Sequence, residues 1–123
     1  MNCEHVRDNL VARQADEWNV WGDPELFGHK SAVMTRACES AGRDPATLWR
    51  SAQALVLVGR EPGPQDGPRA IGGSLEQLRD TVGRYAAVGL DELIVPDGHL
   101  GGDPARSREL YDVMAYDVLP AVV

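Results

Sequence analysis

The stretch "ADEWNVWG" at residues 15–22 places Trp18 and Trp21 around Asn19, behind a pair of acids. Two interpretations are open for these residues. In the first, the stretch is the lip of a site, and Asn19 and Trp21 face a ligand. In the second, it is a strand that buries large aromatics, so that Trp18 lies in the core and Trp21 packs beneath a loop.

Two further places carry polar side chains that could do chemistry. Arg60 could face an anion, although a lone arginine in a polar loop is usually solvated. Asp97 lies close in sequence to His99, and such a pair could transfer a proton. The alternative for Asp97 is structural, because aspartate also opens turns such as "DGHLGG".

The residue spacing does not indicate a metal site, a nucleophile elbow, a phosphate-binding loop or a cysteine pair. His5, His29 and His99 have no metal-ligand spacing with one another or with the cysteines, so we expect no metal site. The sequence has no G-x-S-x-G elbow, and "GREPGPQDG" lacks the Lys-Ser/Thr of a phosphate-binding loop. Cys3 and Cys38 form no C-x-x-C pair, and we expect two free thiols.

The composition indicates one acidic globular domain that spans residues 1–123. The net charge is −7 and the 12 Lys and Arg residues are scattered, so nucleic acid is not an expected partner. No apolar run approaches the roughly 20 residues of a membrane helix. The N-terminus also lacks the layout of a signal peptide. We therefore expect a cytoplasmic protein that meets no membrane.

Helical and strand patterns alternate along the chain, which predicts parallel strands joined by helical crossovers in an α/β fold. Asp23 and Ser74 are expected to cap helices, the latter in a capping box with Gln77. The glycine-rich residues 59–73 are expected to form a long loop. The predicted helices cover residues 2–14, 23–42, 74–89 and 103–120, and the predicted strands cover residues 15–22, 49–58 and 90–97.

Two long segments of the sequence resemble a known family. They are "LVARQADEWNVWGDPELFGHKSAVMTRACESAGRDPATLWRSA" and "IGGSLEQLRDTVGRYAAVGLDELIVPD". Their motifs, taken in order and with their spacing, resemble the bacterial luciferase-like monooxygenases, in particular the members that use the deazaflavin coenzyme F420. The resemblance covers roughly residues 6–118.

The resemblance implies a partial (β/α)8 TIM-type barrel with about three parallel strands and flanking helices. A whole barrel takes about 250 residues, so these residues match the C-terminal third, with its sixth to eighth strands. The first five strands, and the glycine-rich loop that holds the cofactor phosphate in the family, are not among them. The "IGGS" at residues 71–74 is expected to cap a helix, with a phosphate contact as the alternative.

The resemblance also implies a cofactor and a reaction. FMN or coenzyme F420 would carry hydride transfer or oxygen insertion on a small organic substrate. The segment Asn19, Val20, Trp21 and Gly22 would run beside the phosphate and side chain of the cofactor. The resemblance assigns no catalytic residue to this part of the barrel.

Three parallel strands leave two open edges and an uncovered inner face, so we expect a homo-oligomer or a complementary barrel chain as partner. We expect little activity from these residues alone. A truncated gene product, one half of a split barrel and a small self-associating domain remain open. The alternative function is a non-catalytic assembly module that completes a barrel with another chain or homodimerises.

Overall fold

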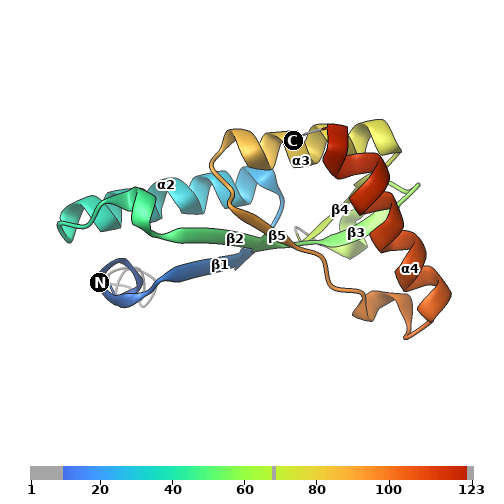
Figure 1. Cartoon of the computed structure of the whole chain (residues 1–123), viewed down its shortest axis with the longest axis horizontal. Helices are drawn as coiled ribbons and strands as arrows, with labels where there is room; N and C mark the ends of the chain where they lie inside the picture. The colour runs from blue at the N-terminus through green and yellow to red at the C-terminus, as the bar shows by residue number, and fades with distance from the viewer. Residues whose placement is uncertain (1–9, 68, 122–123) are drawn as a thin grey trace.

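The computed structural model describes residues 10–67 and 69–121. Its main sheet holds three parallel strands in the order β1 (Glu17–Trp21), β2 (Trp49–Gln53) and β5 (Glu92–Ile94). Figure 1 shows helices α2 and α3 on one side of this sheet. The parallel strands with flanking helices confirm the α/β class and the three strands that the sequence predicted.

Helix α2 (Pro24–Ser40) begins where its cap was predicted. The Asp23 carboxylate accepts a hydrogen bond from the Leu26 amide at 2.9 Å, and proline occupies the first turn. The helix ends before Gly42, whose φ of 76° lies in the left-handed region that glycine tolerates best. The buried side of α2 includes Phe27 and Met34, which pack against the sheet and the helical residues 10–14.

Helix α3 (Leu75–Ala87) confirms the capping box. The Ser74 hydroxyl accepts from the Gln77 amide at 3.2 Å, and the Gln77 side chain accepts from the Ser74 amide at 2.8 Å. Leu78, Val82 and Tyr85 form its buried side. Ser74 of the "IGGS" segment therefore caps this helix, as expected.

The predicted strand 49–58 and the predicted loop 59–73 both need correction. The strand is interrupted at Ala54, and its second half, β3 (Leu55–Val58), leaves the main sheet. It pairs instead with β4 (Ala70–Gly73) in a separate two-stranded parallel sheet, inside the stretch predicted to be loop. A Cβ on Gly72 would lie 2.5 Å from the Arg60 and Leu57 carbonyl oxygens, so glycine here permits close backbone packing within a strand.

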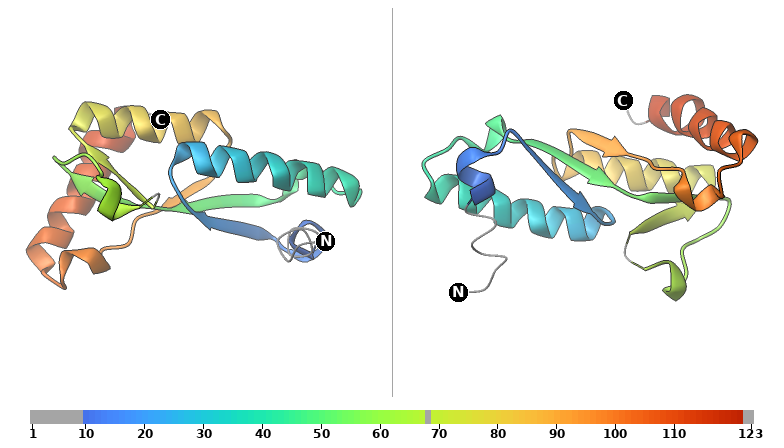
Figure 2. Two further views of the ribbon diagram at one scale, coloured as in Figure 1. Left: turned by 180° about the vertical axis from the view of Figure 1, so that it is seen from behind. Right: turned by 90° about the horizontal axis from the view of Figure 1, so that it is seen from below.

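The two faces of the main sheet differ in their surroundings. Trp18, Val20 and Leu93 pack against the core cluster that α2 and α3 contribute. Because side chains alternate along a strand, Glu17, Asn19 and Trp21 point to the opposite face. The views in Figure 2 show α2 and α3 on the first side only. The second face, over which neither of these two helices lies, is called here the open face.

The C-terminal part is helical from the predicted cap onward. The Asp103 carboxylate accepts from the Ala105 amide at 3.0 Å at the start of α4 (Pro104–Asp112). The chain then continues as a π-helical segment at Val113–Val118 and a 3-10 turn at Leu119–Ala121. The sequence predicted the extent of this helix and gave no sign of the wider π turns.

The predicted start of the first helix, with Cys3 and His5, lies outside the described residues. Cys38 is fully buried beside Met34 and Leu48, which explains its place on the apolar side of α2. Among the residues that the structure describes, no helix is both long and apolar enough to cross a membrane.

Candidate functional site

The carboxyl end of β1 carries the first predicted site, and the open face presents two of its residues. Asn19 is exposed and Trp21 is half-buried. The Arg69 guanidinium lies 5.5 Å from the centre of the Trp21 ring, in a cation–π contact. One side of the indole is therefore covered by a cation that the sequence analysis had not singled out.

Asn19 is held in place by its neighbours on the sheet. Its Nδ2 donates to the Ser51 hydroxyl at 2.8 Å, and that hydroxyl donates to the Glu17 carboxylate at 3.1 Å. Ser51 is fully buried, so this chain of hydrogen bonds is shielded from water at its centre. The Asn19 amide group is thereby fixed in orientation.

Val20 and Gly22 are placed differently from Asn19. Val20 packs against the core beneath the helices, so its side chain does not reach the open face. The Gly22 amide donates to the Gln53 carbonyl at 3.3 Å, and the Gly22 carbonyl accepts from the Tyr85 hydroxyl at 2.5 Å. Both polar groups of the Gly22 backbone are thus engaged within the protein.

Tyr85 connects α3 to the end of β1, and sequence reasoning placed it only on an apolar stripe. It is fully buried, and its ring meets Phe27 edge-on at 6.2 Å. Burial, followed by the nearby charge of Asp23, raises the pKa of the Tyr85 hydroxyl well above its ordinary value. The hydroxyl therefore stays protonated and donates to Gly22 across the working pH range.

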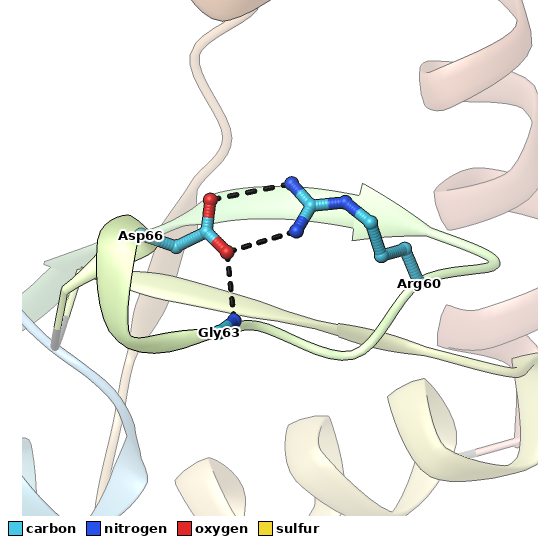
Figure 3. Close-up of polar contacts among 3 residues, drawn as sticks. All are labelled: Arg60, Gly63 and Asp66. Atoms are coloured by element: carbon cyan, nitrogen blue, oxygen red, sulfur yellow. Dashed lines mark hydrogen bonds and ion pairs between the residues drawn. The ribbon is translucent and has the colours of Figure 1, made fainter.

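The second predicted place, Arg60, is an ion pair rather than a free cation. Its guanidinium makes two hydrogen bonds to the Asp66 carboxylate, at 2.9 and 3.2 Å, and the Gly63 amide donates to the same carboxylate at 2.7 Å (Figure 3). The contacts from Arg60 and then from Gly63 lower the pKa of Asp66, and the Asp66 carboxylate in turn raises the pKa of Arg60. The pair closes the turn between β3 and β4.

The third predicted site, at Asp97 and His99, is a turn, which was the structural alternative offered by the sequence. The Asp97 carbonyl accepts from the Leu100 amide at 3.0 Å, so this aspartate opens a 3-10 turn at Gly98–Leu100. The His99 Nε2 atom contacts the Val56 carbonyl of β3 at 3.1 Å. The imidazole is thus directed to β3, and the proposed proton-transfer pair does not form.

The second and third predicted sites, at Arg60 and at Asp97 with His99, are distant in sequence but lie beside one hollow of about 440 Å³. It lies between β3, the turn after β5 and α4. Arg60 and His99 line it, together with Arg106 and Glu109, which sequence reasoning missed. In the described parts of the chain, no three His, Cys, Asp or Glu side chains gather as a metal site would require.

Comparison with known proteins places this geometry in a wider context. No family model and no curated protein matches the sequence. The coenzyme F420 dependent tetrahydromethanopterin reductase from Methanopyrus kandleri matches 96% of the chain with a TM-score of 0.69 at 11% identity. An F420-dependent secondary alcohol dehydrogenase, solved with an F420-acetone adduct, matches 94% with a TM-score of 0.62 at 13% identity.

The chain shares the fold of these enzymes. It spans about half the length of each, 48% of the reductase and 46% of the dehydrogenase. The low identity shows the fold alone. This fold is nevertheless the barrel type that the resemblance in the sequence implied.

Proposed function

We propose that this chain forms the C-terminal part of a luciferase-like oxidoreductase barrel that uses coenzyme F420 or FMN on a small organic substrate. The observation that carries the proposal is the fold, because 96% of the chain superimposes on an F420-dependent reductase. The carboxyl ends of barrel strands are where such enzymes act. In this chain the carboxyl end of β1 carries Trp21, and Asn19 lies two residues before it on the same face.

The residues at this end fit part of a cofactor. The Trp21 ring and the Arg69 guanidinium offer an aromatic surface with a positive charge, suited to a flat or anionic group. The fixed amide of Asn19 adds a polar contact. Gly22 does not fit a phosphate, because its amide already donates to Gln53. The cofactor would supply the hydride or oxygen chemistry, and these residues would bind and orient it.

The open face supports a partner as part of this proposal. Glu17, Asn19 and Trp21 lie on it, and Trp49 is 48% exposed at the register position opposite Glu17. A complementary barrel chain or a second copy would cover these side chains and complete the wall around the cofactor. The whole enzyme would then be the assembly.

A non-catalytic assembly module is the second candidate. It is favoured by the polar chemistry of the described residues, since Asp97 and His99 do not pair and Arg60 is engaged with Asp66. A module of this kind would bind its partner chain and take up no cofactor.

Cofactor binding separates these candidates. We would titrate coenzyme F420 and, in parallel, FMN into the chain alone and into its complex with the first five strand–helix units of a luciferase-like barrel. The enzyme proposal expects tight binding in the complex, weakened at least about tenfold by Trp21→Ala, where a Trp contact is lost. Tyr116→Ala, at an exposed aromatic in the C-terminal helical segment and away from the sheet, serves as the control and should leave binding unchanged. A complex that forms and binds neither cofactor would support the module and contradict the enzyme.

A further inference from the structure

Arg50 is a buried cation at the amino end of β2, the opposite end of the sheet from the site proposed above. It is only 8% exposed, beneath α2. Its Nη1 lies 2.9 Å from the Ser31 carbonyl oxygen, 2.6 Å from the Ser31 hydroxyl and 2.8 Å from the Thr35 hydroxyl, so its two N–H groups are shared among three acceptors. Its Nη2 reaches the Pro45 carbonyl at 3.4 Å. All of these acceptors are neutral.

Among the residues that the structure describes, no carboxylate forms an ion pair with this guanidinium. The ion pairs within residues 10–67 and 69–121 are Arg60–Asp66 and Arg84–Asp80, and Arg50 takes part in neither. Buried charges in proteins are ordinarily paired, because an ion loses its hydration on burial. The Arg50 charge is held by neutral acceptors, an environment that favours an anion nearby.

The guanidinium also keeps a free donor that faces water. An arginine has five N–H groups, and the Arg50 Nε donates to none of the described residues. No buried side-chain nitrogen or oxygen in the described chain lacks a partner, so Nε must contact solvent. Arg50 also lines a hollow of about 470 Å³, together with Ser31, Thr35, Gly89 and Asp91.

We propose that this hollow is a binding site for a phosphate group, held by the Arg50 guanidinium and by the Ser31 and Thr35 hydroxyls. Each hydroxyl accepts from Arg50 and so keeps its own hydrogen to donate. Ser31 and Thr35 are one helical turn apart on α2 and present both hydroxyls to the same side. Arginine binds phosphate in a forked geometry that the remaining N–H groups allow.

Asp91 sets the strength of the site. Its carboxylate lines the hollow and accepts from the Arg50 backbone amide at 2.8 Å. It therefore repels a bound anion without neutralising the guanidinium in an ion pair. Asn in its place would keep an acceptor for that amide and remove the negative charge, so Asp91→Asn is expected to strengthen binding.

Titration of the 123-residue chain with inorganic phosphate, followed by amide chemical shifts, tests the proposal. Saturable shifts are expected at Ser31, Thr35 and Gly89, absent with chloride at the same ionic strength. Arg50→Gln should abolish them, and Arg60→Gln, in the turn between β3 and β4 of the separate sheet, should leave them unchanged. Asp91→Asn should lower the dissociation constant about threefold, the size of a partly screened charge contact.

Further variants guard against misfolding of Arg50→Gln. Arg50→Lys keeps the charge without the fork, and Thr35→Ala removes one hydroxyl at the same wall. Each should weaken phosphate binding while the spectrum retains its native dispersion. Equal shifts with chloride, unchanged binding in these two folded variants, or weaker binding by Asp91→Asn would each overturn the site. None of these results depends on F420 or FMN binding.

Discussion

At the scale of single residues, the hydroxyl of Tyr85 is expected to stabilise the fold through its contact with Gly22. Tyr85→Phe removes the donor to the Gly22 carbonyl and leaves that acceptor unpaired next to the core. An unsatisfied buried group costs about 1–3 kcal/mol, so the free energy of unfolding should fall by that amount. Denaturant unfolding followed by fluorescence measures it.

Tyr111→Phe is the matched control for this change. Tyr111 also donates to a carbonyl, that of Val95 at 3.1 Å, but its side chain is exposed and water replaces the lost partner. Tyr111→Phe should therefore lower the free energy of unfolding by less than Tyr85→Phe does. Equal costs for the two variants would show that the Gly22 contact has no special weight.

The Asp66 carboxylate should titrate below its ordinary pKa of about 3.9. Arg60 first, and the Gly63 amide second, favour its charged form. The stability from this contact is present above the unfolded-state pKa and is lost as the pH falls through the lower folded-state pKa. A carbon-detected NMR titration measures the midpoint. Arg60→Gln should move it upward, and a midpoint unchanged by Arg60→Gln would contradict the assigned cause.

At the scale of elements, helix α3 depends on its capping box. Ser74→Ala removes the acceptor for the Gln77 amide and should lower the free energy of unfolding by about 1 kcal/mol. Ser40→Ala, at the exposed last residue of α2, is the control and should change it little. Thermal and denaturant unfolding of both variants give the comparison. A loss from Ser40→Ala as large as that from Ser74→Ala would argue against the cap.

The elements also show where sequence patterns reach their limit. The caps at Asp23, Ser74 and Asp103 were predictable because each is formed by residues within one turn. Strand β4 was not, because glycine and proline around it indicate a loop, and its pairing with β3 depends on chain packing 15 residues away, as Leu55 with Ala70. The interruption at Ala54 follows from the same pairing.

At the scale of the whole molecule, the open face should govern assembly. Trp49 is 48% exposed on it, and a partner that completes the barrel would bury this side chain. Buried interface tryptophans are often worth at least about 2 kcal/mol, so Trp49→Glu should weaken association at least about tenfold. Sedimentation of the chain, alone and with the complementary barrel units, measures this.

Tyr116→Glu is the control for association. Tyr116 is the more exposed aromatic, at 76%, but it lies in the C-terminal helical segment and not on the sheet. The Tyr116→Glu substitution should leave association unchanged. Association that responds to Tyr116 and not to Trp49 would place the interface elsewhere.

The sequence by itself determined the helices, their caps and the parallel order of the main strands, because these depend on local periodicity and on short-range hydrogen bonds. Tertiary structure alone decided which polar side chains meet. Tyr85 reaches Gly22 across 63 positions, and Arg50 reaches Ser31 across 19. No local pattern encodes such contacts, since they follow from how α2 and α3 pack on the sheet. The stretch at residues 15–22 illustrates both. Its strand, with Asn19 and Trp21 on the opposite face from Val20, was predictable, whereas packing settled which of the two faces the helices cover.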